Sequence, residues 1–153
     1  MHWFENSIPP PLVAAICALL MWLSAAQMPT LEAPLNWRLV GSLVLLVSGL
    51  GVCLAGVASF HQAKTTVNPL KPASATVLVT SGIYRVTRNP MYLGFALVLA
   101  AWTVFLDSPF ALLGVAAFVL YINRFQILPE ERALRRLFGN DLDKYCARVR
   151  RWI

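Results

Sequence analysis

The chain of 153 residues has the length of one domain, and its composition is that of an integral membrane protein. Hydrophobic residues make up 58% of it and charged residues 13%, whereas a soluble domain has roughly 25% charged residues. The formal charge of +6 comes from basic residues that flank apolar stretches, without the exposed aromatic residues of a nucleic-acid surface, which argues against a nucleic-acid partner. Three scattered cysteines and two distant histidines predict no disulfide framework and no metal site.

Four apolar stretches follow one another along the chain, over about residues 9–28, 37–60, 91–106 and 110–128. A helix that crosses a bilayer needs ~20 apolar residues. The first stretch is too long for the apolar part of a signal peptide and has no basic residue before it, so we interpret it as a retained span. The single domain 1–153 is therefore predicted to be all-α, with about four transmembrane helices.

The second stretch is rich in small residues. Its Gly49-Leu50-Gly51 sequence lacks the last glycine of the dinucleotide-binding fingerprint and the strand–turn–helix setting that the fingerprint requires. Gly51 and Ala55, four residues apart, instead favour close packing against another helix.

A polar segment, residues 61–80, separates the second and third apolar stretches. A loop of this length inside a compact protein is usually functional. Its last part, Thr76–Val79, is typical of a short extended piece, and Ser81-Gly82 of a turn.

The stretch from Gly82 to Gly94 leads into the third apolar helix. Asn89 is predicted to be the N-cap residue and Pro90 the first helical residue, where its missing N–H has no cost. Arg85 and Arg88 then lie just outside the apolar helix, where cations meet lipid headgroups or a bound ligand.

Two further boundaries are predicted after this helix. At Asp107-Ser108-Pro109 a tight break, with Ser108 as the cap, forces the third and fourth helices into an antiparallel hairpin. At Pro129 the proline and two acidic residues indicate the start of a tail helix, which Gly139 ends. A second short helix is expected from Asp141 to about residue 149, and the basic residues beside Trp152 suit a membrane interface.

Basic residues gather in residues 60–90 and in the tail, so the positive-inside rule places both segments and both termini in the cytoplasm. Several polar residues of this face allow two interpretations. Glu130 and Glu131 either begin a helix and pair with Arg88 or Arg132, or contact a ligand. Arginine and tyrosine side chains at this level either anchor the interface or bind a ligand; they are Arg85, Arg88, Tyr84, Tyr92 and Arg124.

Three groups of residues, in order, resemble the isoprenylcysteine carboxyl methyltransferase family, whose broader superfamily includes the phospholipid N-methyltransferases. The groups are Leu78-Val79-Thr80-Ser81-Gly82-Ile83-Tyr84, Arg88-Asn89-Pro90-Met91-Tyr92-Leu93-Gly94, and Glu130-Glu131 with Phe138-Gly139. The resemblance covers about residues 60–153. It implies a membrane enzyme that transfers a methyl group from S-adenosylmethionine, bound from the cytoplasm, to a small lipidic acceptor in the bilayer.

By this resemblance we expect a multi-pass protein of the bacterial inner membrane whose cofactor-binding half is residues 60–153. The resemblance implies these cofactor-binding residues: Thr76, Val77, Leu78, Val79, Tyr84, Arg88, Asn89, Pro90, Met91, Tyr92, Glu130 and Glu131. Glu130 is expected to meet the cationic end of the cofactor, and Arg124 is our hypothesis for the electrostatic anchor of the acceptor.

The chain departs from the family pattern at three positions. Asn89 stands where the eukaryotic enzymes have histidine, Gln126 lies near the position of a family arginine, and Leu142 replaces the first of two tyrosines, of which Tyr145 is retained. Two other functions are weighed: a membrane sterol-type reductase that uses NADPH, and a non-enzymatic membrane protein whose polar loop binds a partner. The sequence does not set the oligomeric state.

Overall fold

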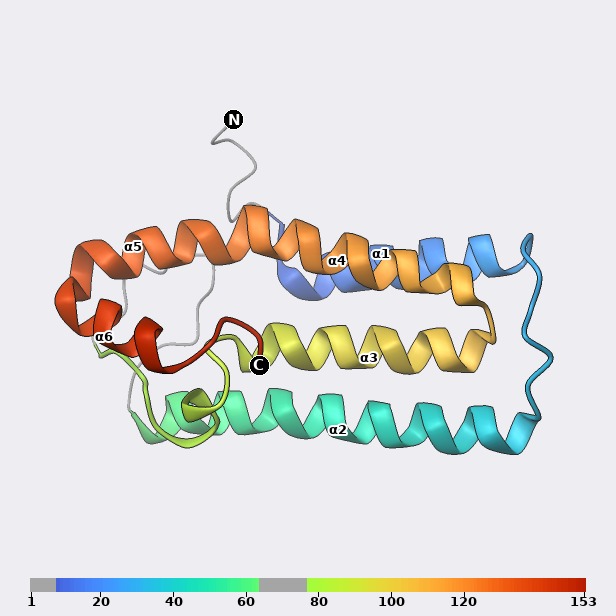
Figure 1. Ribbon diagram of the computed structural model, residues 1–153, viewed down its shortest axis with the longest axis horizontal. Helices are drawn as coiled ribbons and strands as arrows, with labels where there is room; N and C mark the ends of the chain where they lie inside the picture. Colours follow the sequence, from blue (N-terminus) through green and yellow to red (C-terminus); the bar gives the residue numbers. More distant parts are fainter. Residues whose placement is uncertain (1–7, 64–76) are drawn as a thin grey trace.

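The computed structural model describes residues 8–63 and 77–153, and every regular element in these ranges is helical. The four long stretches run antiparallel to their neighbours in sequence (Figure 1). They are α1 (Pro10–Ala25), α2 (Leu35–Gln62), α3 (Pro90–Leu106) and α4 (Leu112–Ile122). Short 3₁₀ helices, η3 (Gly82–Arg85) and η4 (Pro109–Ala111), precede α3 and α4. The predictions of an all-α fold and of a hairpin between the third and fourth helices are confirmed.

Two of the long helices are longer than the other two. α2 has 28 residues, and the fourth helix continues from Pro109 to Phe138, 30 residues in all. Both are long and apolar enough to cross a membrane, whereas α1 and α3 have 16 and 17 residues. At ~1.5 Å per residue the short helices reach only about 25 Å. The crossing of all four helices therefore stays a prediction. The bounds of α1, α2 and α3 lie within three residues of the expected ones, whereas the fourth helix continues ten residues past its expected end at residue 128.

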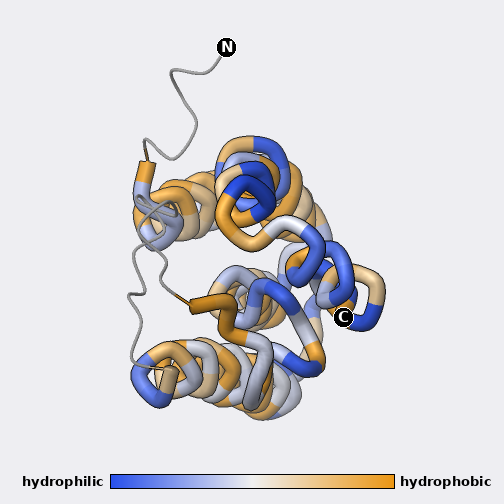
Figure 2. The backbone as a smooth tube through the Cα atoms, turned by 90° about the vertical axis from the view of Figure 1, so that its left-hand side faces the viewer, coloured by the Kyte–Doolittle hydropathy of each residue, from blue (hydrophilic) through white to orange (hydrophobic). Residues whose placement is uncertain are grey.

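Both long helices extend beyond the start of α3 at one end of the bundle (Figure 1). Between their ends lie η3, the short helix α6 (Asn140–Arg148) and the C-terminal residues. Figure 2, which views the bundle from this end, shows hydrophilic residues concentrated on the tail. We call this the polar end. The outward faces of α1, α2 and α4 expose many leucines and valines, more than the surface of a soluble protein normally carries.

Helices α2 and α3 pack closely through glycines. A Cβ atom added to Gly94 would lie 2.6 Å from the carbonyl oxygen of Gly49, and one added to Gly49 would lie 2.8 Å from that of Gly94. Close helix packing through small residues was expected, but of the two residues named for it, Gly51 was wrong: a Cβ atom on Gly51 meets nothing within 4 Å. Gly51 lies two residues from Gly49, and two residues correspond to about 200° around a helix.

Asp107 holds together the end of the bundle opposite the polar end. Its backbone is left-handed, with φ of 56°, and ends α3. Its carbonyl oxygen accepts a hydrogen bond from the N–H of Leu31 at 3.0 Å, and its carboxylate accepts one from Ala33 at 3.2 Å. Arg38 donates to the carbonyl of Phe105 beside it. The next residue, Ser108, occupies the N-cap position before Pro109, as predicted, but its side chain makes no capping bond.

Contrary to the prediction, the tail does not begin with a separate capped helix at Pro129. A π-turn, Asn123–Ile127, connects α4 directly to α5 (Leu128–Phe138), and the N–H of Leu128 bonds to the carbonyl of Asn123. A proline inside an α-helix lacks an N–H and collides with the carbonyl four residues earlier. A wider turn placed just before the proline lets the helix continue. Gly139 ends α5 with a φ of 47°, as predicted.

The contact between α2 and α3 gives a stability test with a matched control. We expect Gly94→Ala to lower the free energy of unfolding by roughly 1–3 kcal/mol, because the added methyl group overpacks a backbone contact. Gly51→Ala changes a residue of the same helix pair that faces open space. It should leave the free energy of unfolding unchanged or raise it by a few tenths of a kcal/mol, because alanine favours the helix. Thermal unfolding in detergent measures both variants, and equal effects would contradict the proposed contact.

Candidate functional site

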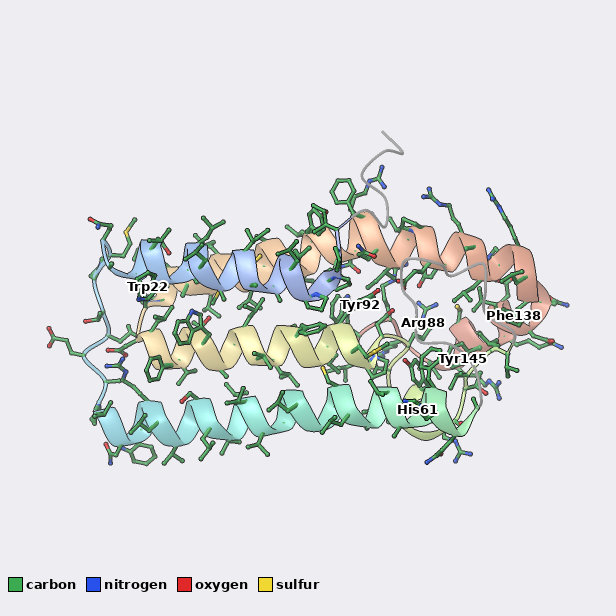
Figure 3. The ribbon with its side chains drawn as sticks, turned by 180° about the vertical axis from the view of Figure 1, so that it is seen from behind. Trp22, His61, Arg88, Tyr92, Phe138 and Tyr145 are labelled. Atoms are coloured by element: carbon green, nitrogen blue, oxygen red, sulfur yellow. The ribbon has the colours of Figure 1, made fainter. Side chains whose placement is uncertain are left out.

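Most of the residues implied by the family resemblance meet where α3 begins. Figure 3 shows Tyr92 at this level and Arg88 and Tyr145 farther toward the polar end, between the two long helices. Four segments contribute side chains: the approach to η3, the start of α3, α5 with α6, and the C-terminal residues. The sequence places these segments far apart, and the two extended helix ends bring them together.

Glu130 and Tyr92 form the innermost contact of this group. The hydroxyl of Tyr92 donates to Oε1 of Glu130 at 2.5 Å. Glu130 lies in the charged part of the fourth helix, outside the apolar stretch that ends at residue 128. Burial raises the pKa of this carboxyl group to about 7, the bond from Tyr92 lowers it, and the charge of Glu131 raises it. A carboxylate that is costly to ionise gains most from an incoming cation.

Tyr84 is buried beside this pair. Its ring meets that of Phe60, on α2, edge-on with 5.4 Å between centroids. Its carbonyl oxygen accepts a hydrogen bond from the Tyr145 hydroxyl at 2.7 Å, which connects η3 to α6. Burial is the main cause that raises the pKa of both phenols, that of Tyr145 to about 12, so both stay neutral near pH 7.

Glu131 joins two arginines from opposite directions. Its Oε1 lies 3.3 Å from Nη1 of Arg88, and its Oε2 lies 2.7 Å from Nη2 of Arg151. Arg88 Nη1 also donates to the sulfur of Cys146, on α6. The pairing of Glu131 with Arg88 was one of two interpretations of the sequence, and the structure shows it. Arg151 was not foreseen, because its sequence neighbours indicated only a membrane interface.

The C-terminal residues 150–152 lie along the approach to α3. The N–H of Arg88 donates to the carbonyl of Arg150 at 3.1 Å, and Nδ2 of Asn89 donates to the carbonyl of Arg151 at 2.9 Å. The hydroxyl of Thr87, which is fully buried, donates to the same carbonyl. Asn89 therefore occupies the N-cap position of α3 without making the predicted side-chain capping bond, because its amide group binds the C-terminal segment instead.

Trp152 extends this contact into the bundle. Its indole N–H donates to the side-chain oxygen of Asn123, in the π-turn, at 3.2 Å, and its ring packs against a cluster that includes Tyr92 and Ile127. A tryptophan next to arginines is typical of an interface, and the sequence has no signal that distinguishes this internal role. Thr87, Arg151 and Trp152 are the site residues that sequence reasoning missed.

The other expected site residues lie around this group. Val79 and Pro90 are buried, Leu78 is half-buried against Leu142 and Tyr145, and Val77 is exposed. The carbonyl of Met91 accepts a weak bond from Cys53. Thr76 lies outside the described residues. Arg124 is exposed in the π-turn, with its guanidinium 5.4 Å from the centre of the Phe125 ring.

This arrangement has the chemistry of a cation-binding site beside an apolar bundle. A half-buried carboxylate and phenol face the bundle, and an ion-pair network on the polar side supports them. In residues 8–63 and 77–153, no three histidine, cysteine or acidic side chains gather as metal ligands would. A charged residue at the edge of an apolar helix bundle usually marks a functional site.

Comparison with known proteins supports the resemblance. Residues 37–141 match the phospholipid methyltransferase family. A stretch of 63 residues, 41% of the chain, is 48% identical to an uncharacterized protein of Haemophilus influenzae over the whole of that protein. No solved structure matches the chain.

Two plant proteins with assigned names are also similar. A probable protein-S-isoprenylcysteine O-methyltransferase of Oryza sativa subsp. indica is 31% identical over 110 residues, which cover 70% of this chain and 56% of that protein. Protein-S-isoprenylcysteine O-methyltransferase B of Arabidopsis thaliana is 33% identical over 72 residues, which cover 47% and 36%. The matched residues thus span about half or less of these two relatives. The family match extends over most of this chain, so the chain belongs to the phospholipid methyltransferase family.

Proposed function

We propose that this protein is an integral membrane enzyme that transfers a methyl group from S-adenosylmethionine to a lipidic acceptor. The proposal rests on the family match and on one structural observation. Tyr92 and Glu130 are hydrogen-bonded where the apolar bundle meets the polar end, so this contact lies at the boundary between the two. The sterol-type reductase and the non-enzymatic protein are not favoured by the family match.

The residues present suit this cofactor. S-adenosylmethionine carries a sulfonium and an ammonium group, and the poorly hydrated carboxyl of Glu130 offers the negative charge that they need. Leu78, Val79 and Tyr84 supply the apolar and aromatic surface for an adenine ring, and Pro90 and Met91 lie at the start of α3 beside them. Glu131 and Asn89 are engaged with Arg151, so we assign them the task of holding this surface in place.

The side chains would act mainly by position and charge. The sulfonium group supplies an activated methyl group that leaves a neutral thioether behind, so no nucleophilic side chain is required. In the proposed site, Glu130 binds the cationic end, the phenol of Tyr92 orients that carboxylate, and the bundle excludes water. An ion pair gains strength when water is excluded around it.

The acceptor is proposed to enter from the bilayer, and its headgroup to lie at the level of the π-turn. Arg124, exposed at this level, remains our hypothesis for its electrostatic anchor. The isoprenylcysteine or phospholipid nature of the acceptor is inferred from the names of the family and the relatives. Because the polar end holds the excess of basic residues, we place it on the cytoplasmic side of a bacterial inner membrane.

Binding of the cofactor is the first test. Titrated with S-adenosylmethionine in detergent, the purified protein should show saturable binding by calorimetry, and titrated with NADPH it should show none. Binding of NADPH without binding of S-adenosylmethionine would indicate a reductase, which would contradict the proposal.

The affinity for the cofactor should depend on pH through Glu130. Its pKa of about 7 in the free protein means that a bound cation must displace a proton below this pH. We therefore expect the affinity to fall on acidification below pH 7, by up to tenfold per unit, and to level off above it. Glu130→Gln should bind weakly and lose this part of the pH profile. A variant with the wild-type affinity and profile would reduce Glu130 to a structural residue.

Arg151 provides a test of the supporting network. Arg151→Ala removes both hydrogen bonds to Glu131, which at about 1.5 kcal/mol corresponds to roughly tenfold weaker cofactor binding. Arg150→Ala is the matched control, because in the described part of the chain its side chain makes no ion pair with Glu131. Calorimetry on both variants decides the point. If the two lose affinity equally, the effect comes from surface charge and the network has no positioning role.

A further inference from the structure

A hollow of about 420 Å³ opens on the polar end, apart from the residues around Glu130. Its wall consists of Thr80, before η3, Arg85, on η3, and three residues from α6 and its end, Tyr145, Arg148 and Val149. Neither Glu130, Glu131 nor Tyr92 lines it. The hollow is therefore distinct from the Tyr92–Glu130 pair, although it adjoins the candidate site through Tyr145, whose hydroxyl bonds to the Tyr84 carbonyl.

The two arginines of the hollow lack acidic partners within the described part of the chain. Arg85 makes no side-chain hydrogen bond or ion pair there, and Arg148 makes only a 3.4 Å bond to the carbonyl of Lys144. Four other arginines of the described residues pair with carboxylates: Arg38 with Asp107, Arg88 and Arg151 with Glu131, and Arg135 with Asp143. Arg136 also lacks a carboxylate partner there, but it lies outside the hollow. Two arginines that line one hollow, with no carboxylate in its lining, make it a positive site with unused hydrogen-bond donors.

The remaining walls suit an anion with several oxygen atoms. Thr80 is exposed, so its hydroxyl is available as a donor. Tyr145 is held in place by its bond to the Tyr84 carbonyl, and its phenol stays neutral near pH 7, so it adds no competing negative charge. Val149 is buried and closes one side of the hollow. Guanidinium groups bind phosphate oxygens in pairs, through parallel N–H bonds.

The hollow also lies where phosphate groups are abundant. η3 packs against the end of α2, since a Cβ atom on Gly82 would lie 2.5 Å from the Ser59 hydroxyl and the Tyr84 ring meets Phe60. The outward face of α2 exposes large apolar side chains as far as Leu54, little more than one turn before this level. An apolar helix that ends beside arginines is the usual setting in which anionic headgroups bind.

We propose that the hollow between η3 and α6 binds a phosphate group through Arg85 and Arg148, as a site separate from the cofactor site. The source of the phosphate is either an anionic lipid headgroup, such as that of phosphatidylglycerol, or a soluble phosphate ester. The site would hold the tail against the membrane surface when the source is a lipid.

The test compares Arg85→Gln/Arg148→Gln with Arg136→Gln, which changes an exposed arginine outside the hollow. Each full-length protein is placed in phosphatidylcholine nanodiscs with and without phosphatidylglycerol, and native mass spectrometry counts the retained anionic lipid. A second arm titrates inorganic phosphate and glycerol 3-phosphate by thermal shift. We expect lipid retention or soluble phosphate binding to fall at least tenfold in the double variant. Both should stay at the wild-type level in the control.

The two arms identify the source: loss in the lipid arm alone assigns a headgroup, and loss in both assigns the phosphate group itself. Arg85→Lys/Arg148→Lys should bind at an intermediate level, because the charge remains and the paired donors are lost. The affinity for S-adenosylmethionine should be unchanged in every variant, so failure of this proposal is distinguishable from failure of the proposed function. Equal loss in Arg136→Gln, or loss of cofactor affinity with phosphate binding intact, would overturn the proposal.

Discussion

The hydrogen bond between Tyr92 and Glu130 is the contact on which the candidate site depends. It joins the first turn of a short apolar helix to the charged end of a long one, and it places a half-buried carboxyl group at the edge of the bundle. Such a group is costly to ionise unless a cation arrives. The burial that makes this carboxyl group costly to ionise therefore favours the binding of a cation beside it.

The surrounding structure keeps this carboxyl group in place by ion pairs and backbone bonds. Glu131, the next residue, is held between Arg88 and Arg151, and Asn89 binds the carbonyl of Arg151. These contacts tie the start of α3, the fourth helix and the C-terminal segment into one unit. A site of this kind needs rigid support, because catalysis by positioning is lost when the side chains that hold the reactants move.

The helices and much of the site could be predicted from the sequence. Apolar length located all four long helices, Pro90 and Gly139 marked a start and an end, and the family motif named Tyr84, Tyr92 and Glu130, which the structure brings together. Local rules failed where a distant residue competed for the same group. The side-chain amide of Asn89 donates to the carbonyl of Arg151 and makes no capping bond. The π-turn before Pro129 lets the helix continue where a new helix was expected to begin. Residues such as Trp152 could not be assigned because their partners lie about 25 residues away or more.

The central claim, methyl transfer to a lipid, is tested most directly by following the methyl group itself. Purified protein in nanodiscs made from total bacterial lipid is incubated with S-adenosylmethionine that carries an isotopic label in its methyl group. The lipid extract is then analysed by mass spectrometry. The account predicts a lipid species that gains one labelled methyl group with wild-type protein and much less with Glu130→Gln. Cofactor binding without any labelled lipid would contradict it.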